Sequence, residues 1–386
     1  MDSSEKRILL ITRNLPPLVG GMENLLLHCT RTLDSQHLLT VIGPRGCSAY
    51  LNKSIDVHEV PSGLVGFVLM APFYAIGCIG RKRFDLVFGG SGLAAPVCWL
   101  VGKLSRATTA CYVHGLDVVV DNWLYQTVFV RCLRRLDFIV VNSSNTRRLC
   151  AQAGIAPNTV TIIYPGCDVP AEINRAAARD VLRISYAVDS DFCMLFVGRV
   201  APRKGLLKFM RNAFPELLRR RPDTMLVIAG DSPEESLAHR GDELAKVVQE
   251  VENNGWSDRV RFLGKVDDAA LSQCYAAADC LLFPLVPVQG DVEGFGMVAI
   301  EAAAHGTPTV AFAEGGVGDA VRDGESGLLV PSGDYGAMVD ALLSVANIAN
   351  SVSACREHAL RFSWDVFDEK FGSTISNAKS ARRRPG

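Results

Sequence analysis

Two glutamates close a segment that is otherwise glycine and apolar: in EGFGMVAIE, Glu293 and Glu301 lie eight positions apart. The segment follows the strand-like run CLLFP, and MVAIEAAAH predicts a helix that Gly306 ends. Glu293 would then precede the helix, and Glu301 would lie in its second turn. At a rise of about 1.5 Å per residue, roughly 12 Å would separate the carboxylates. One elongated polar ligand can use both, although Glu293 as a helix cap and Glu301 in solvent would also explain the pattern.

The backbone between the two glutamates favours an anion. Gly294 and Gly296 let a ligand approach the main chain closely. The N–H groups at the helix start, from Gly296 to Val298, attract negative charge. A ligand with a sugar at Glu293, a diphosphate at the helix start and a ribose at Glu301 would use the whole segment.

A cationic loop is predicted elsewhere in the same half of the chain. FVGRVAPRKG ends a strand and opens a helix, and it contains Arg199, Arg203 and Lys204. Two or three cations at the carboxyl end of a strand suit a diphosphate, because arginine binds phosphate oxygens in pairs and lysine acts as a point charge. The glycine spacing is not that of a Walker A loop. The alternative is a solvated basic loop.

The first half of the chain contains weaker signals. Gly20 and Gly21 follow the first strand and precede a helix that is predicted to start near Met22, which makes an anion site or a plain tight turn. His114 follows the strand TTACYV, where it can bind a sugar, steer a proton or serve the structure alone. Asp117 can orient that histidine or bind an acceptor. The glycine-rich run at 314–321 lacks the full dinucleotide fingerprint and is interpreted as a structural turn.

The elements that must position these residues alternate along the chain. Apolar runs of strand length are separated by helical patterns, which predicts an α/β fold with doubly wound parallel sheets. The alternation weakens between residues 166 and 185, where we expect a linker. The predicted domains are residues 1–175, residues 176–360, and residues 361–386 as a final helix with a basic tail. The predicted strands are RILLIT, HLLTVIG, DLVF, TTACYV, DFIVVN, VTIIY, CMLFVG, TMLVIAG, RVRFLG, CLLFP, PTVAF and GLLVP.

Composition narrows the class of protein. The chain of 386 residues is longer than one hydrophobic core usually accommodates, so we expect about two domains. The net charge of -1 provides no basic field that would attract nucleic acid. The 12 cysteines form no CxxC pair, so zinc and thioredoxin-like sites have no support and the thiols should behave as small hydrophobes. The N-terminus lacks the pattern of a signal peptide, and we expect a cytoplasmic protein.

Residues 63–80 form an apolar stretch of 18 residues that Arg81, Lys82 and Arg83 follow. The length reaches the lower limit for a membrane span, and Pro72 weakens that interpretation. A buried or surface-docked helix is one expectation. A helix that touches the inner membrane face, with the basic residues of 81–83 at anionic headgroups, is the other.

Over nearly its full length the chain resembles the family 4 retaining glycosyltransferases, which have the GT-B fold of two facing Rossmann-like domains. The resemblance rests on GRVAPRKG, on the paired glutamates of EGFGMVAIE and on TPTVAFAEGGVGDAVRDGESGLLV. It implies that Glu293 and His114 act at the transferred sugar, and that FSWDVFDEKF returns to the first domain. The implied donor-binding residues are Gly20, Gly21, Arg199, Lys204, Lys265, Val266, Gly294, Phe295, Gly296, Met297, Val298 and Glu301.

The resemblance also implies a reaction. A hexose would pass from a nucleotide sugar to a hydroxyl of a lipid-linked or polysaccharide acceptor, with retained anomeric configuration and with no metal or cofactor. GRVAPRKG and DVEGFG are most similar to mannosyltransferases that act on phosphatidylinositol mannosides, which favours GDP-mannose as the donor. The alternatives are a hexosyl or HexNAc transferase that uses a UDP-sugar, a nucleotide-sugar-binding protein without turnover, an NAD-dependent oxidoreductase and a membrane-anchored scaffold.

Overall fold

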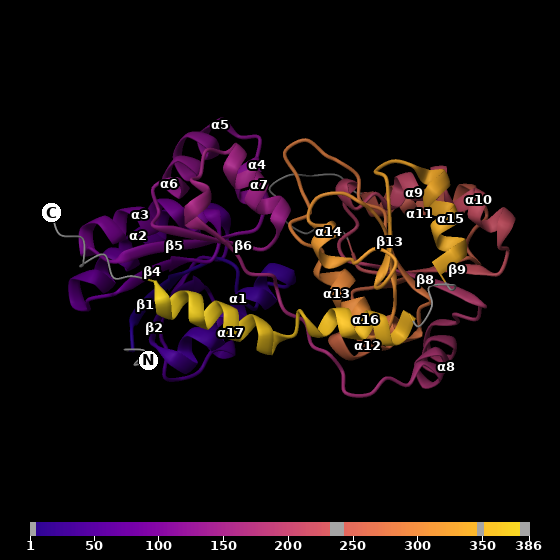
Figure 1. The fold of residues 1–386 in the computed structure, drawn as a ribbon, viewed down its shortest axis with the longest axis horizontal. Coiled ribbons are helices and arrows are strands. Elements are labelled where there is room, and N and C mark those ends of the chain that lie inside the picture. The colour runs from indigo at the N-terminus through magenta and orange to yellow at the C-terminus, as the bar shows by residue number, and fades with distance from the viewer. Residues whose placement is uncertain (1–4, 232–242, 346–350, 379–386) are drawn as a thin grey trace. The chain divides into compact units, whose positions relative to one another are not determined.

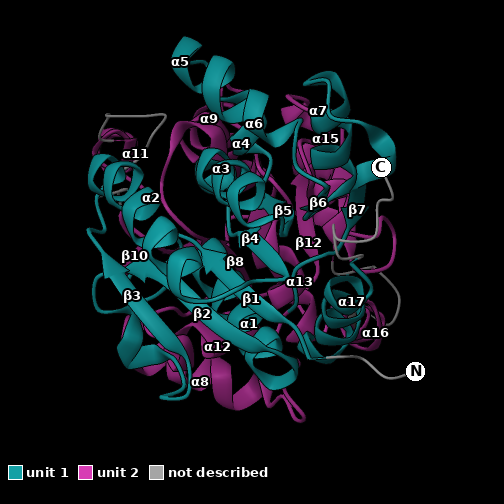
Figure 2. Cartoon of the chain, turned by 90° about the vertical axis from the view of Figure 1, so that its left-hand side faces the viewer, with its two compact units in different colours: residues 1–166, 364–386 teal, residues 167–363 magenta. Residues whose placement is uncertain are grey.

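The computed structural model describes residues 5–231, 243–345 and 351–378, so the predicted basic tail at 381–386 lies outside the described residues. The chain forms two compact units, residues 1–166 with 364–386 and residues 167–363 (Figure 2). Each unit contains one parallel sheet with helices packed against it (Figure 1). The predicted doubly wound α/β class is confirmed.

Unit 1, residues 1–166 with 364–386, has a seven-stranded sheet in the order β3-β2-β1-β4-β5-β6-β7. Its strands are parallel and mostly buried, because helices leave little of either face to water. The strands are β1 (Arg7–Ile11), β2 (Leu38–Pro44), β3 (Asp56–Val60), β4 (Leu86–Gly89), β5 (Thr108–Val113), β6 (Phe138–Val141) and β7 (Val160–Ile162). The helices are α1 (Gly21–Gln36), α2 (Leu64–Arg81), α3 (Ala95–Ser105), α4 (Leu116–Val119), α5 (Trp123–Tyr125), α6 (Arg131–Leu133), α7 (Ser144–Gln152) and α17 (Trp364–Asn377).

Unit 2, residues 167–363, has a six-stranded parallel sheet in the order β10-β9-β8-β11-β12-β13. Phenylalanines from β8, α9 and α10, among them Phe196, Phe209 and Phe214, contribute to its core. The strands are β8 (Phe192–Val197), β9 (Thr224–Ala229), β10 (Val260–Gly264), β11 (Cys280–Phe283), β12 (Thr309–Phe312) and β13 (Gly327–Val330). The helices are α8 (Arg175–Tyr186), α9 (Leu206–Asn212), α10 (Phe214–Arg220), α11 (Glu243–Asn253), α12 (Asp268–Ala277), α13 (Met297–Ala304), α14 (Val317–Ala320), α15 (Tyr335–Ser344) and α16 (Ser351–Leu360).

The C-terminal helix α17 belongs to unit 1, as the resemblance implied (Figure 2). It packs along α1, where the Thr32 hydroxyl donates to Asp368 at 2.5 Å. Lys6, just before β1, donates to the carbonyl of Ile375 at 2.7 Å. Phe371 is fully buried against Phe88 of β4. The helix is therefore part of the core of unit 1.

The unit boundaries differ from the predicted domain boundaries at residues 175 and 360. The segment after Gly166 packs on unit 2, since the Cys167 N–H donates to the Phe362 carbonyl at 2.7 Å and Arg356 donates to the carbonyl of Pro170 at 2.7 Å. These contacts move the first boundary to 166/167 and the second to 363/364.

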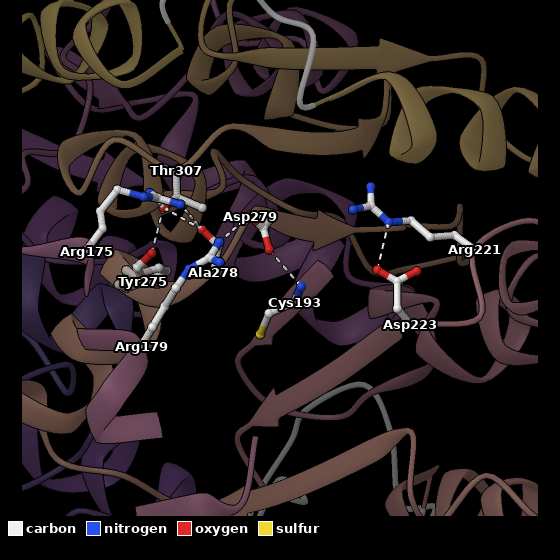
Figure 3. A network of polar contacts seen from close by, with 9 residues as sticks. All are labelled: Arg175, Arg179, Cys193, Arg221, Asp223, Tyr275, Ala278, Asp279 and Thr307. Carbon is white, nitrogen blue, oxygen red and sulfur yellow. Dashed lines mark hydrogen bonds and ion pairs between the residues drawn. The ribbon is translucent and has the colours of Figure 1, made fainter. Parts of the chain in front are cut away.

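The predicted linker at 166–185 is wrong in its second half, because residues 175–186 form helix α8. Arg175 donates to the Ala278 carbonyl at 2.6 Å and to the Thr307 hydroxyl at 3.2 Å (Figure 3). Arg179 pairs with Asp279, whose other oxygen accepts the N–H of Cys193 at 2.8 Å. Charged side chains thus tie α8 to the amino ends of β8 and β11, an arrangement that hydrophobic periodicity does not signal.

The twelve cysteines are all buried and form no disulfide, as expected of thiols that serve as small hydrophobes.

Helix α2 differs from a core helix in the exposure of its side chains. Phe67, Ala71 and Ala75 are buried in the core of unit 1, but Val65, Leu69, Phe73 and Ile76 are exposed. Among the described residues, α2 is the one helix with the length and apolarity that a membrane crossing needs, a property that core helices share.

Candidate functional site

The strand order of unit 2 directs attention to one place. From β8 the chain proceeds to β9 and β10 on one side of the sheet, and then returns to β11 on the other side of β8. In open parallel sheets, ligands bind beyond the carboxyl ends of the strands at such a reversal. The loop after β8 contains Arg199, Arg203 and Lys204, and the loop after β11 contains Glu293. The topology therefore brings the two predicted motifs together.

The cationic loop is shaped by a short turn and a glycine. Residues 202–204 form a 3-10 turn that ends at Gly205, whose φ is +70°. A Cβ at Gly205 would lie 1.8 Å from the carbonyl oxygen of Pro284, so the loop can approach β11 only with glycine here. This approach places the Lys204 Nζ 4.7 Å above the centre of the Phe283 ring. Arg199 is exposed at the start of the loop.

Glu293 is the meeting point of the two loops. Its Oε2 accepts a hydrogen bond from Lys204 Nζ at 2.7 Å and also pairs with the guanidinium of Arg203. The Nε of Arg203 lies 3.2 Å from Asp291 Oδ1. The alternative of Glu293 as a helix cap is wrong, because Gly296 holds the cap position without a side-chain bond. Two carboxylates, Asp291 and Glu293, engage Arg203, and its role as a cation for phosphate stays a prediction.

The electrostatics of this cluster follow from its burial. Burial alone would raise the pKa of Glu293, but Arg203 and then Lys204 outweigh it and hold this pKa at about 2. Burial lowers the pKa of Lys204 to about 8, and the nearby Arg203 and Arg199 act in the same direction while Glu293 opposes them. Glu293 is thus ionised at neutral pH, and the pKa of Lys204 lies close to neutral pH.

The start of α13 has the open amide end that the glycines predicted. The helix begins at Met297 after Gly296, whose φ is +96° and whose Cβ would lie 2.9 Å from the Phe283 ring. The first N–H groups of a helix, here those of Met297 and Val298, have no acceptor within it. The Phe295 side chain is buried against Phe362, so Phe295, like Gly294, would contact a ligand through its backbone.

The glycine-rich run at 314–321 forms a turn at Gly315 and Gly316, as interpreted from the sequence, and continues as helix α14. The Gly316 N–H donates to the Glu293 carbonyl at 3.0 Å. A Cβ at Gly316 would lie 2.1 Å from the Gly294 carbonyl oxygen, and one at Gly315 would lie 2.7 Å from that of Glu293. This turn therefore supports the backbone of Glu293 from behind.

Glu301 lies in the second turn of α13 and is only partly exposed, so the alternative in which it faces solvent is wrong. Its Oε2 accepts the Tyr275 hydroxyl at 2.7 Å. Burial raises the pKa of Glu301, and the bond from Tyr275 only partly opposes this. Lys265 and Val266, which the resemblance implies as donor-binding residues, follow β10 just before the Asp267 cap of α12. They lie at the same edge of the sheet as the other predicted donor-binding residues of unit 2, and their ligand roles stay predictions.

Gly20 and Gly21 in unit 1 begin α1, whose first helical residue is Gly21, one position before the predicted start. The carboxylate of Glu23 lies over Gly20, because a Cβ there would be 2.5 Å from Glu23 Oε2. The same carboxylate accepts a bond from Asn14 at 2.8 Å. An acid thus occupies the first turn of this helix, and the donor role of the two glycines stays a prediction.

His114 directly follows β5 and is buried against Tyr112. Its Nε2 lies 2.8 Å from the Gly90 carbonyl, which can only accept, so Nε2 is the protonated nitrogen and Nδ1 is an acceptor in the neutral ring. Asp117 does not touch the ring: it accepts the N–H groups of His114 and Gly92 at 2.8 and 2.9 Å. Asp117 therefore shapes the backbone, and the sugar-binding role of His114 remains a prediction.

Sequence reasoning missed two members of the site in unit 2. Asp291 and Tyr275 received no role, although they hold Arg203 and Glu301. The Asp-x-Glu spacing of Asp291 and Glu293, opposite the adjacent Arg203 and Lys204, was a usable signal for a charge network. Tyr275 lies inside an ordinary helical pattern and offered none.

A groove of about 600 Å³ lies in unit 1 over β3 and α2. Met70, Phe73 and Tyr74 form its apolar wall, and Arg81 and Lys82 lie at its basic end. Its lining includes the first residue of β3 and the last of α2. It is therefore at the amino ends of the strands and is separate from the predicted chemistry.

The chain was compared with known proteins. Residues 191–347 match the family model described as "Glycosyl transferases group 1", and residues 19–170 match the model "Glycosyltransferase Family 4". The chain is 30% identical, over 97% of its length and 100% of the relative, to a GDP-mannose-dependent alpha-(1-6)-phosphatidylinositol monomannoside mannosyltransferase of Mycolicibacterium smegmatis. It is 27% identical to D-inositol 3-phosphate glycosyltransferase 2 of Catenulispora acidiphila, over 95% of this chain and 93% of that one.

Solved structures share the fold. The structure of Anabaena Alr3699/HepE in complex with UDP and glucose superposes with a TM-score of 0.78 at 20% identity, over 97% of this chain and 100% of that chain. At this identity the likeness concerns the fold alone.

Proposed function

We propose that this chain, which belongs to the family 4 glycosyltransferases and has their GT-B fold, moves a hexose from a nucleotide sugar to a hydroxyl of a lipid-linked or polysaccharide acceptor. We favour mannose from GDP-mannose, because the relative from Mycolicibacterium smegmatis is named for that donor. A UDP-sugar is the second candidate, since the Anabaena structure of the same fold holds UDP and glucose.

One observation carries the proposal: Lys204 and Glu293 form an ion pair beyond the carboxyl ends of β8 and β11. Glu293 lies three residues before Gly296, where the amide end of α13 begins. A diphosphate at that helix end would have Lys204 and the exposed Arg199 within the same loop. Cations and helix N–H groups stabilise best where charge develops, which here is on the departing nucleoside diphosphate.

We propose retention through attack on the same face of the sugar. The bond from the anomeric carbon to the diphosphate oxygen breaks, the bond to the acceptor oxygen forms, and the leaving phosphate takes the acceptor proton. Glu293, held by two cations, would orient the sugar rather than attack it. The neighbouring Asp291 pairs with Arg203 and so does not supply the second free carboxylate that a retaining glycosidase uses.

We also propose that transfer needs no metal and no cofactor. The cationic loop supplies positive charge next to the helix end. The chain has one Asp-x-Asp triplet, Asp189 to Asp191, and it immediately precedes β8. It therefore lies at the amino end of the sheet, away from Lys204 and Glu293.

A thermal-shift screen with GDP, UDP and ADP tests the donor, because a ligand that binds the native state raises the melting temperature. We expect GDP to give the largest shift. GDP-mannose labelled in the sugar should then pass label to a lipid extract or glycan, and NMR of the product should give the α-configuration of the donor. Binding without transfer to any acceptor would favour the non-catalytic alternative, and a larger shift with UDP would move the assignment to UDP-sugars.

We further propose that the protein is cytoplasmic and docks on an anionic membrane surface through α2. The unpaired thiols support a reducing compartment. The exposed Leu69 and Phe73 lie one helical turn apart, and Arg81 and Arg83 follow at the helix end. An apolar helix face beside exposed cations suits the headgroup boundary of an anionic leaflet.

Flotation with vesicles tests this docking. The wild-type protein should float with vesicles that contain phosphatidylglycerol and less with pure phosphatidylcholine. The double change Leu69→Glu and Phe73→Glu should abolish flotation. Ile184→Glu, at a side chain of α8 that is 80% exposed, is the matched control and should float like the wild type. Equal flotation of all three proteins would exclude α2 as the docking surface.

A further inference from the structure

Two cations share one carboxylate oxygen in the site of unit 2. Lys204 Nζ lies 2.7 Å from Glu293 Oε2, and Arg203 Nη1 pairs with the same oxygen. Arg203 also reaches Asp291, through Nε at 3.2 Å. All four side chains are at most 16% exposed. The four groups therefore form a compact network with two positive and two negative charges. The two cations differ in the number of carboxylates that they contact.

The inequality lies in the number of partners. Arg203 has two carboxylates, Asp291 and Glu293. Lys204 has the single shared oxygen, and within the described residues no other carboxylate pairs with it. If Lys204 moved to an incoming phosphate, Glu293 would keep Arg203 as its partner. Without Arg203, the same movement would leave a buried carboxylate unpaired, which is strongly unfavourable.

The backbone keeps Arg203 in this position. Its carbonyl accepts the N–H of Val286 at 2.9 Å, which joins the loop after β8 to the loop after β11. Two residues after Arg203, Gly205 packs closely against the Pro284 carbonyl. Arg203 is thus anchored at its main chain and at its guanidinium, whereas Lys204 extends from the same turn across the Phe283 ring.

We propose that Arg203 is a positioning residue of the donor site: it holds Glu293 in place through the shared oxygen and so releases Lys204 to bind the donor diphosphate. This inference rests on the proposed function, because it assigns Lys204 to a diphosphate. It gives a role to a residue that the sequence resemblance left without one.

The proposal has a consequence for titration. Burial lowers the pKa of Lys204 to about 8, Glu293 opposes this, and Arg203 and Arg199 add to it. Glu301 also feels the charge of Lys204. Loss of the positive charge at 203 should raise the pKa of Lys204, because a like charge disappears and Lys204 no longer shares Glu293 with another cation.

The experiment is calorimetric titration with GDP between pH 6 and pH 10, which requires no turnover. The wild type should bind GDP below pH 8 and lose affinity as Lys204 loses its proton. Arg203→Ala should bind at least tenfold more weakly at pH 7, and its loss of affinity should shift to higher pH. Arg203→Lys should recover part of the affinity. Ionisation of GDP is common to all titrations, so the differences report on the protein.

Arg175→Ala is the matched control, since Arg175 is a partly buried arginine of the same unit whose bonds lie at the amino ends of the strands (Figure 3). It should lower the melting temperature and leave the GDP affinity and its pH midpoint unchanged.

If Arg203→Ala fails to fold, Asp291→Asn replaces it. Loss of an anion should then move the midpoint to lower pH.

The inference is overturned if the wild type binds GDP and Arg203→Ala shows the same affinity and pH midpoint. It is also overturned if Arg175→Ala shifts the midpoint as Arg203→Ala does, because the effect would then be structural. A wild type that binds none of GDP, UDP and ADP overturns the proposed function itself, and the inference falls with it. If UDP or ADP binds in place of GDP, the same series with that nucleotide decides the role of Arg203.

Discussion

At the scale of single residues, the site is a set of charges that burial makes interdependent. Glu293 stays ionised because Arg203 and Lys204 offset the cost of its burial. Such charge-assisted hydrogen bonds contribute about 1.5–3 kcal/mol each. Arg199, exposed in the same loop, is the cation that no carboxylate of the described residues pairs with. Lys204 and Arg199 are therefore the groups that we propose bind the donor diphosphate.

We expect Lys204→Ala and Arg199→Ala each to lower turnover at least tenfold, a loss of about 1.4 kcal/mol of transition-state stabilisation. The reason is that each removes positive charge from the place where we propose that the diphosphate departs. Steady-state kinetics with the donor found by the thermal screen measure the effect. Lys208→Ala, at an exposed position of α9, is the control and should keep full activity. Unchanged rates in the two loop variants would remove the diphosphate role.

The ribose role of Glu301 has a sharper test than loss of affinity alone. Glu301→Ala should weaken GDP binding, and 2′-deoxy-GDP should bind the wild type more weakly than GDP if a ribose hydroxyl meets this carboxylate. In that case the two losses will not add, because either change removes the same contact. Calorimetry of the four combinations measures the coupling. Strict additivity would mean that Glu301 supports the helix through Tyr275 and does not touch the ribose.

At the scale of elements, glycines decide how closely the loops of the site approach. Gly205 lies in the left-handed region at the end of the cationic turn and against the Pro284 carbonyl. The Gly315–Gly316 turn supports Glu293 in the same way from the other side. The positions of Lys204 and Glu293 thus depend on backbone contacts as much as on their own ion pair.

Gly205→Ala should destabilise the fold and weaken nucleotide binding. Gly255→Ala is a matched control, because Gly255 has a similar φ of +68° and open space around its Cβ position, whereas Gly205 has φ +70° and a backbone oxygen at 1.8 Å. The conformational cost alone is about 1–2 kcal/mol and applies to both. Urea denaturation should therefore show a clearly larger loss for Gly205→Ala. Equal losses would mean that the loop can move away from β11 freely.

At the scale of the whole molecule, the chain builds two sheets with separate cores and returns its last helix to the first of them. Phe371 of α17 is fully buried beside Phe88 and Phe367, so residues far apart in the sequence complete one core. The stability of unit 1 consequently depends on a helix that is synthesised after all of unit 2.

Phe371→Ala should lower the free energy of unfolding by about 3–5 kcal/mol, the usual cost of a cavity left by a buried aromatic ring. Equilibrium denaturation in urea measures it. Phe262→Ala, at a side chain of β10 that is 37% exposed, should cost much less. If the two variants lose the same free energy, α17 contributes no more to the core of unit 1 than a surface residue contributes to its strand.

The sequence alone determined the class of fold, because a buried parallel strand requires a continuous apolar run and a covering helix requires a period near 3.6. Twelve predicted runs correspond to observed strands, and the helix after Gly296 ends before Gly306 as predicted. The missing strand, β3, has the sequence DVHEV and is a half-exposed edge strand with no such run. Helix α8 escaped notice because only Ala178 and Leu182 of it are buried.

Only the tertiary structure decided which charges act on one another. The residue types in the loop did not separate Arg203 from Lys204 as cations, yet Arg203 holds two carboxylates and Lys204 shares a single oxygen. His114 and Asp117 suggested a pair, but the ring bonds to Gly90 and the carboxylate to backbone N–H groups. Periodicity follows from each residue's own neighbours along the chain, whereas an ion pair between residues 90 positions apart depends on how two loops approach in space.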